Sequence, residues 1–462
     1  MARNTSIVKQ SQQDIVKLSG MSGNISTPTC SIPFENSLTY NGYGDLYYQR
    51  DSQATFINRT TRLLQTVNID EARFEQDGLL LEGPSQNYCI WSTDFSRSAW
   101  SKTNMSIDIT NIPNSVKSSP TARFDATKFI ANSNISAARL SYGFSLTDSV
   151  IDANVVSFSI FVKFNTKVRA FELLINKRNP TSNVTGKAKF ILDFSPPDQS
   201  DNPDFGYITA DPTITNDTNT TVIDTNIDNL TNGWSRISIT VQFDSISPVD
   251  AFDAILSPWP TVNNQIDSSG TNMTFVAYGA QVERRCYATS FIPTNGAVAT
   301  RSEDLLRIQT DRNLPHISYN YTVAMDIKMK GKPLFSNPVI FRTGNLNFDN
   351  SEEQHRIIRF NSGASNGVGA FEIYPGSTQS VNLPTFFNPK GRNRIGFRRS
   401  SLETSVFMNG RILGKDSTFQ HGNGARDWMW FGSYGSAQHF DGNISQIRIY
   451  DKALSDNEIY MV

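Results

Sequence analysis

Apolar residues at every second position are the feature that most constrains how this chain can fold. The alternation is clear in Val155–Phe164 (VVSFSIFVKF), Phe171–Ile175 (FELLI), Arg236–Phe243 (RISITVQF), Tyr321–Met329 (YTVAMDIKM) and Ile444–Tyr450 (ISQIRIY). A period of two is typical of a β-strand with one face packed on a core. Turn-forming pairs such as Asn232-Gly233 and Asn409-Gly410 separate these segments. The sequence therefore predicts an all-β protein built from antiparallel sheets.

Helical patterns are short and few. Asp14–Ser19 and Ala453–Met461 are the best candidates, and Ser455 with Glu458 three residues later fits a capping box. The segment Asn202–Asn232 is rich in Asn, Thr and Asp, with intermittent Val and Ile. We interpret it as a long strand-and-loop excursion, with a flexible low-complexity linker as the alternative.

The length of the chain indicates more than one domain. At 462 residues it exceeds what one ordinary core supports, and the 38% hydrophobic and 11% aromatic fractions suit a folded chain. The strand pattern breaks near residue 50 and again near residue 300. Because the first fifty residues contain no convincing core, we interpret them as an extended arm or docking segment.

Charge and hydropathy exclude several classes of partner. With 42 basic and 43 acidic side chains the formal net charge is -1, which gives no electrostatic footprint for nucleic acid or an anionic membrane. No stretch approaches the roughly 18 apolar residues of a membrane span, and Met1–Gly20 is too polar for a signal peptide. We therefore expect synthesis in a cytoplasm, no nucleic-acid binding and no membrane insertion.

Four stretches occur in an informative order along the chain. QATFINRTTRLLQTVNIDEARFEQDGLLLEG begins at Gln53, NYCIWSTDFSRSAWSK at Asn87, GWSR at Gly233 and GAQVERRCYATSFIP at Gly279. In this order they resemble motifs of bacteriophage tail-fibre and other virion proteins. The last three resemble the opening, one strand and the closing motif of a jelly roll of the carbohydrate-binding-module type.

A fifth stretch, FDGNISQIRIYDKALSDNEI at Phe440–Ile459, is similar to the end of laminin-G-like, concanavalin A-like sandwiches. The resemblances together imply two tandem antiparallel β-sandwiches. We expect an N-terminal arm that docks on the virion at 1–50, a β connector at 51–86, a carbohydrate-binding-module-like jelly roll at 87–300, and a laminin-G/concanavalin A-like domain at 301–462.

The function implied by this resemblance is non-catalytic. It is that of a virion structural protein, first a tail fibre or similar appendage that mediates host attachment through surface glycans, and the fibre resemblance also implies a homotrimer. One alternative is a capsid decoration or head-fibre protein, and another is a polysaccharide depolymerase. Fold alone does not decide among them.

Cysteine usage gives no disulfide framework. The chain has three cysteines, Cys30, Cys89 and Cys286, so one disulfide at most could form, and part-buried free thiols are the simpler interpretation. The resemblance places Cys89 and Cys286 on the first and last strands of the jelly roll. It therefore predicts contact between these two residues.

Recognised catalytic motifs are scarce. The four histidines are scattered, none in H-E-x-x-H or H-x-H spacing, and the chain has no Walker loop or dinucleotide fingerprint. A pair of carboxylates for glycoside hydrolysis would be set by the fold, so the sequence leaves it open. Calcium is compatible with sandwiches of both kinds, but nothing resembles an EF-hand, so no ligand set is predicted and no cofactor is expected.

Aromatic residues near amides and charges are the candidates for sugar binding, since flat rings pack on pyranose faces. The densest cluster contains Trp428, Trp430 and Tyr434. On a strand, the two tryptophans point to one face while Met429 and Phe431 point to the other, so one pair is core. Packed tryptophans are the simpler interpretation, and exposure in a groove would favour a lectin.

Two further aromatic residues differ in their expected roles. Trp259 lies between prolines, which predicts a loop and an exposed ligand contact. Trp234 heads an alternating strand and is expected in the core. The basic run Lys390–Arg399 (KGRNRIGFRR) and the Arg284-Arg285 pair are interpreted as solvated strand faces or as salt bridges between subunits, with contact to an anionic glycan or a lipopolysaccharide phosphate as the alternative.

Overall fold

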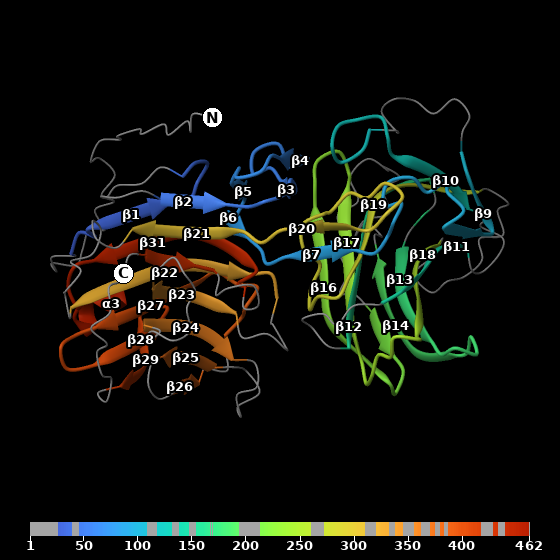
Figure 1. Cartoon of the computed structure of the whole chain (residues 1–462). Coiled ribbons are helices and arrows are strands. Elements are labelled where there is room, and N and C mark those ends of the chain that lie inside the picture. The colour runs from blue at the N-terminus through green and yellow to red at the C-terminus, as the bar shows by residue number, and fades with distance from the viewer. Residues whose placement is uncertain are drawn as a thin grey trace. The chain divides into compact units, whose positions relative to one another are not determined.

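A computed structural model of the chain is almost entirely β (Figure 1), as the sequence predicts. It describes residues 26–38, 46–108, 118–131, 138–146, 154–166, 168, 170–193, 213–259, 272–309, 320–331, 338–344, 355–361, 370–374, 379–382, 387–416, 428–432 and 439–461. The chain forms two compact units. Unit 1 comprises Met1–Ser52, Asn68–Gly83 and Glu303–Val462, and unit 2 comprises Gln53–Val67 and Pro84–Ser302.

Unit 2 is a sandwich of two antiparallel sheets. One sheet has the order β16 (Thr220–Asn229), β17 (Ser235–Phe243), β12 (Val155–Thr166), β19 (Met273–Glu283), β10 (Thr127–Ala131) and β9 (Met105–Ile107). The other has the order β15 (Thr213–Asn216), β14 (Val184–Asp193), β13 (Ala170–Arg178), β18 (Ala251–Trp259), β11 (Arg139–Ser145) and β8 (Trp100–Thr103). Two small ribbons pair β7 (Ser85–Asn87) with β20 (Ala299–Arg301), and β3 (Ala54–Ile57) with β4 (Leu64–Val67).

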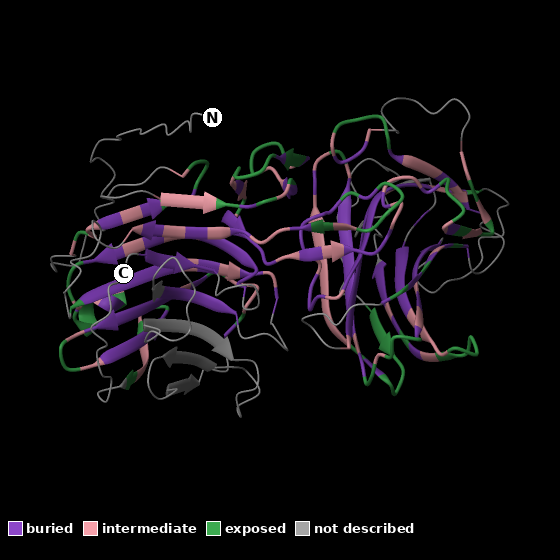
Figure 2. Ribbon diagram, viewed as in Figure 1, coloured by how far each residue is buried: buried purple, intermediate pink, exposed green. Residues whose placement is uncertain are grey.

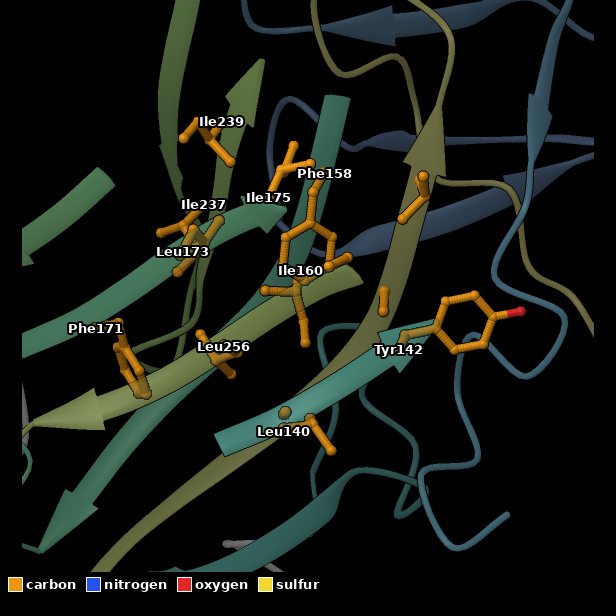
Figure 3. Close-up of a cluster of buried hydrophobic side chains, with 14 of the residues drawn as sticks. Leu140, Tyr142, Phe158, Ile160, Phe171, Leu173, Ile175, Ile237, Ile239 and Leu256 are labelled. Atoms are coloured by element: carbon orange, nitrogen blue, oxygen red, sulfur yellow. The ribbon is translucent and has the colours of Figure 1, made fainter. Parts of the chain in front are cut away.

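The core of unit 2 is built by the predicted alternation. Figure 3 shows Phe158 and Ile160 of β12 beside Leu173 and Ile175 of β13, which belongs to the other sheet. All four side chains are fully buried. Trp234 is 1% exposed and its indole N–H donates to the Ser118 carbonyl at 2.9 Å, so its predicted core role is confirmed.

Unit 1 is a second sandwich. One sheet has the order β29 (Arg411–Asp416), β28 (Thr404–Met408), β27 (Asn393–Arg399), β22 (Tyr321–Met329), β31 (Gly442–Tyr450), β6 (Gly78–Leu81) and β5 (Arg73–Glu75), and β1 (Cys30–Pro33) also pairs with β31. The other has the order β2 (Leu46–Gln49), β21 (Leu305–Gln309), β30 (Trp428–Phe431), β23 (Val339–Gly344), β24 (His355–Asn361), β25 (Ala370–Tyr374) and β26 (Gln379–Asn382). Figure 2 shows that buried residues follow the central strands.

The domain boundaries differ from those expected. Cys30–Pro33 and Leu46–Gln49 are strands of unit 1, paired with β31 and β21, so this part of 1–50 is not a separate arm. The reason is that Cys30 and Ile32 supply fully buried side chains to the sandwich core. The expected connector is divided between the units, since Gln53–Val67 belongs to unit 2 and Asn68–Gly83 to unit 1.

The short helix at the C-terminal end is confirmed. α3 spans Asp456–Met461, and the capping box is formed as predicted: the Ser455 N–H donates to Glu458 Oε2 at 2.7 Å, and the Glu458 N–H donates to Ser455 Oγ at 3.3 Å. The other candidate, Asp14–Ser19, lies outside the described residues. Of the Asn/Thr-rich segment, Thr213–Asn216 and Thr220–Asn229 are paired strands, so the linker alternative is wrong for them.

The opening and closing motifs of the jelly roll meet, as the resemblance implies. Asn87 is fully buried, and its side-chain oxygen accepts the N–H groups of Cys89 at 3.0 Å and Val282 at 3.1 Å. Its amide group donates to the carbonyls of Ala280 at 3.1 Å and Ile292 at 2.8 Å. One side chain thus joins three stretches of unit 2.

The predicted placement of the cysteines on strands is wrong. Cys89 follows the end of β7, and Cys286 lies in the bend after β19. The backbone groups of Cys89 bond to side chains and not to a neighbouring strand: its N–H donates to Asn87 Oδ1, and its carbonyl accepts from Thr294 Oγ1. Cys30, Cys89 and Cys286 are free, buried thiols, so the structure contains no disulfide between Cys89 and Cys286.

A buried ionic cluster fixes two strands of unit 1. Asp304, just before β21, accepts from Arg50 at 3.2 Å, from Arg73, and from the hydroxyl of Tyr48 on β2 at 2.5 Å. Arg73 also pairs with Glu82 at 2.8 Å, and the side chains of Arg50, Arg73, Glu82 and Asp304 are all inaccessible to solvent. Because buried charges must be paired to be tolerated, the cluster specifies the position of β2 against β21.

Candidate functional site

Four residues directly opposite one another form a row across β2, β21, β30 and β23 of unit 1. Tyr47 pairs with Arg307, Arg307 pairs with Trp430, and Trp430 pairs with Arg342. We call these four residues the aromatic–arginine row. Since cross-strand partners on one face lie about 5 Å apart, the register alone alternates ring and guanidinium along the row.

The distances confirm that these side chains stack. The Arg307 Cζ lies 5.5 Å from the ring centroid of Tyr47 and 5.0 Å from that of Trp430, and the Arg342 Cζ lies 5.1 Å from that of Trp430. Trp428, two residues before Trp430 on β30, also contacts these side chains. The Arg307 Cζ lies 4.8 Å from its ring centroid, and the Tyr47 ring meets it edge-on with the two centroids 5.0 Å apart. All are within the range of cation–π attraction.

The alternation predicted for β30 is confirmed. Met429 and Phe431 are fully buried members of the sandwich core, so Trp428 and Trp430 lie on the opposite face of the sheet. The tryptophans are nevertheless only 7% and 1% exposed. Both indoles are therefore covered by neighbouring side chains, and neither exposes a ring face on which a sugar could pack.

The accessible part of the row is Arg307 with Tyr47. Both are half-buried, and Figure 2 shows intermediate exposure along most of β2. Burial lowers the pKa of Arg307, with a smaller opposing effect from Tyr47, but a guanidinium stays charged at neutral pH. Among the described residues Arg307 has no carboxylate partner, and its guanidinium contacts only the rings of Tyr47, Trp428 and Trp430.

Sequence reasoning found two of these residues and missed three. Trp428 and Trp430 were predicted from their density, whereas Tyr47, Arg307 and Arg342 come from other parts of the chain. The signal was present in LLRIQ at Leu305–Gln309, where an arginine stands between apolar residues that face the core. Tyr434, the fourth predicted residue, lies outside the described residues.

Trp259 is not in an exposed loop. It is the last residue of β18, opposite Ala170 of β13, and is 8% exposed. The adjacent proline is tolerated because β18 pairs with β11 only up to Leu256, so Pro258 needs no N–H on that side. Lys189 covers the ring, with Nζ 5.5 Å from the centroid. The predicted loop position is wrong, and the ring offers little open surface.

The basic run is largely neutralised within unit 1. Arg392 pairs with Asp77 at 2.9 Å, Arg394 with Asp326 at 2.6 Å, and Arg398 with Glu403 at 2.8 Å and Asp456 at 2.5 Å. These salt bridges join residues of one chain, whereas the sequence interpretation was of solvated faces or of bridges between subunits. They leave Arg307 as the better candidate for an external partner.

A surface cavity of about 410 Å³ lies elsewhere in unit 1. Met408, Asn409, Arg411 and Leu413 line it on the β28–β29 hairpin, which belongs to the other sheet. Among the described lining residues only Asn409 and Arg411 have polar side chains, and none is aromatic. This cavity therefore lacks the ring that sugar binding favours.

No group of three or more His, Cys, Asp or Glu side chains suited to a metal ion occurs among the described residues. The described part of the chain also contains no helix long and apolar enough to cross a membrane.

A protein-family match covers most of the residues that form the row. Residues 301–460 match the model of the concanavalin A-like lectin/glucanases superfamily. This segment is a concanavalin A-like domain. Three of the four row residues, Arg307, Arg342 and Trp430, lie within it, so the row belongs to a lectin-like fold.

Solved structures that match parts of the chain include a heptameric pentraxin from Limulus polyphemus, with 16% identity, coverage of 31% of this chain and 69% of that chain, and a TM-score of 0.27. Domain 4 of a Geobacillus stearothermophilus arabinanase, in complex with arabinotriose, has 16% identity, 38% and 80% coverage and a TM-score of 0.27. A carbohydrate-binding module of a Ruminococcus gnavus sialidase has 15% identity, 31% and 82% coverage and a TM-score of 0.24. Curated protein sequences gave no match.

Proposed function

We propose that this chain is a non-catalytic glycan-binding protein of a bacteriophage virion, a tail fibre or similar appendage that attaches to host-surface glycans. The observation that carries the glycan-binding part is the aromatic–arginine row on a concanavalin A-like domain. The virion part rests on the ordered motifs from Gln53 to Pro293. In this proposal the chain is synthesised in the cytoplasm of the bacterial host and is then part of the virion.

The row offers the two kinds of contact that sugars need. The half-buried ring of Tyr47 can pack on the C–H surface of a pyranose, and the N–H groups of Arg307 can donate to its oxygens. The buried rings of Trp428 and Trp430 hold the Arg307 guanidinium in place, with its Cζ 4.8 and 5.0 Å from their centroids. A pre-positioned donor binds with less loss of side-chain entropy.

The absence of catalysis is supported by the surroundings of the carboxylates. Hydrolysis of a glycosidic bond requires two carboxyl groups on either side of it, whereas the row contains none. The buried carboxylates Glu82 and Asp304 are held by guanidinium groups. The sequence GASNG at 363–367 fits the G-x-S-x-G pattern of a nucleophile elbow, but it lies outside the described residues and adds nothing to the proposal.

Assembly into a homotrimer, with virion docking through the N-terminal residues, is part of the same proposal. It rests on the fibre resemblance, and a neighbouring subunit would cover exposed sheet edges. Light scattering of the purified chain measures the oligomeric state, and a monomer would count against the fibre. Electron microscopy of particles distinguishes a tail fibre from a head decoration by its location.

Glycan binding is tested with the purified full chain on immobilised host polysaccharides. We expect retention of the wild type and several-fold weaker binding of Tyr47→Ala, since losing about 1 kcal/mol of aromatic contact costs about fivefold. Tyr460→Ala is the matched control, because Tyr460 is 70% exposed on α3 of the same unit. Equal loss in both variants, or no retention of the wild type, would contradict the proposal.

The depolymerase alternative has a separate readout. Incubation with host polysaccharide, followed by size-exclusion chromatography, should leave the chain-length distribution unchanged. Shortened chains would show that the protein cleaves its ligand. Retention on the polysaccharide without shortening supports an adhesin.

A further inference from the structure

Arg307 differs from other arginines of unit 1 in its partners. Arg50 and Arg73 are paired with buried carboxylates, and Arg392 and Arg394 are paired at the surface. Arg307 is half-buried, yet no hydrogen bond or ion pair joins it to another described residue, and its interactions are with rings. A partly desolvated charge without a counter-charge is costly unless a partner arrives from outside.

The rings around Arg307 also set which of its atoms are available. Tyr47, Trp428 and Trp430 lie within 5.5 Å of its Cζ, and cation–π contacts engage guanidinium groups over ring faces. The five N–H donors lie in the plane of the guanidinium and form a fork that matches the two oxygens of a carboxylate or phosphate. Rings cannot satisfy this fork, because they offer no acceptor lone pairs.

The surroundings would strengthen such a pair. Tyr47, Trp428 and Trp430 reduce the access of water to one side of Arg307, and an ion pair gains strength as the local dielectric falls. A neutral sugar hydroxyl would accept from the same charged donors, but it would supply neither the counter-charge nor the paired oxygens that accept two parallel N–H bonds. The row is therefore better matched to an anionic ligand than to a neutral one.

We infer that the saccharide bound at the aromatic–arginine row is acidic, and that its carboxylate or phosphate group pairs with Arg307. The inference rests on the proposed glycan binding and narrows it to one chemical class. Carboxylate and phosphate share the same fork geometry, so the experiment separates these two sources.

The test compares charged and neutral forms of the same polymers. The probes are polygalacturonate with its carboxyl-reduced form, and a phosphomannan with its dephosphorylated form, bound to the full chain in affinity electrophoresis. We expect the wild type to bind the charged member of at least one pair about tenfold more tightly. The preferred pair identifies carboxylate or phosphate, and added salt should reduce the preference by screening it.

Three variants connect that preference to Arg307. Arg307→Gln should bind the charged and neutral forms alike, and Arg307→Lys should keep part of the preference because it retains the charge but loses the fork. Arg392→Gln should keep all of it, since Arg392 is already paired with Asp77. Unchanged thermal unfolding of each variant shows that the fold is intact.

The outcomes separate this inference from the proposed function. Equal binding of charged and neutral polymers by the wild type, or a preference that survives in Arg307→Gln, overturns the acidic ligand while glycan binding stands. A preference lost in Arg392→Gln instead places the anion on the basic run and also overturns it. If the wild type binds neither these polymers nor host polysaccharide, the proposed function fails and the inference fails with it.

Discussion

Arg307 and Trp430 are direct partners in the register of β21 and β30, and the Arg307 Cζ lies 5.0 Å from the Trp430 ring centroid. Arg342 approaches the same indole from β23, at 5.1 Å. The Trp430 indole therefore contacts two guanidinium groups, one from each of the strands that flank β30. The position of β21 is fixed independently by Asp304, which immediately precedes it.

Truncation of Trp430 should destabilise unit 1. Trp430 is 1% exposed, so Trp430→Ala removes a fully buried side chain, and we expect a loss of about 3–5 kcal/mol in the free energy of unfolding. Trp430→Phe should cost less because it keeps a ring beside Arg307. Urea denaturation measures both. Leu402→Ala, at an 81% exposed residue, is the control, and an equal effect there would show that the burial of Trp430 adds no stability.

Removing the charge of Asp304 should be severely destabilising. Asp304→Asn leaves the buried guanidinium groups of Arg50 and Arg73 with one carboxylate fewer, and breaking a buried pair in this way costs about 3–5 kcal/mol. Asp94→Asn provides the comparison, because its pair with Arg97 is solvent-exposed and should contribute less than about 1 kcal/mol. Similar denaturation midpoints for the two variants would show that the buried cluster is dispensable.

The alternation of apolar residues was enough to predict most of the fold. Val155–Phe164 and Tyr321–Met329 lie within strands, because a one-sided core imposes a period of two on any sheet that covers it. The division into units was not predictable in the same way. Cys30–Pro33 is four residues long and becomes recognisable as a strand only beside β31, a partner more than four hundred positions away.

The candidate site was half predictable for a related reason. Trp428 and Trp430 are close in sequence and stand out by composition, and their common face follows from strand geometry. Tyr47 and Arg307 become neighbours of Trp430 only through the register of β2, β21 and β30. Trp259 was misplaced because the rule against proline in central strands was applied to the whole strand, whereas β18 is unpaired on one side at Pro258.

Asn87 should be necessary for the stability of unit 2. Its side chain makes four hydrogen bonds to backbone groups of Cys89, Val282, Ala280 and Ile292. Asn87→Ala leaves these buried groups without that partner, and each unsatisfied group costs about 1–3 kcal/mol. Asn87→Asp retains the acceptor but places a buried carboxyl group against the carbonyls of Ala280 and Ile292, so it should also lower the stability of unit 2. Thermal unfolding compares them, and an unchanged midpoint in Asn87→Ala would contradict this role.

The buried thiols should be inert in the folded chain and should make folding sensitive to alkaline pH. Burial raises the pKa of Cys30 from 9.0 to about 12 and that of Cys89 well above 9.0. Iodoacetamide at pH 8 should therefore label neither until urea is added. Between about pH 9 and 12 the unfolded chain releases these protons while the folded chain keeps them, so the stabilising contribution is lost as pH rises. Cys30→Ala should reduce this alkaline slope, and rapid labelling of native protein at Cys30 would contradict its burial in the sandwich core.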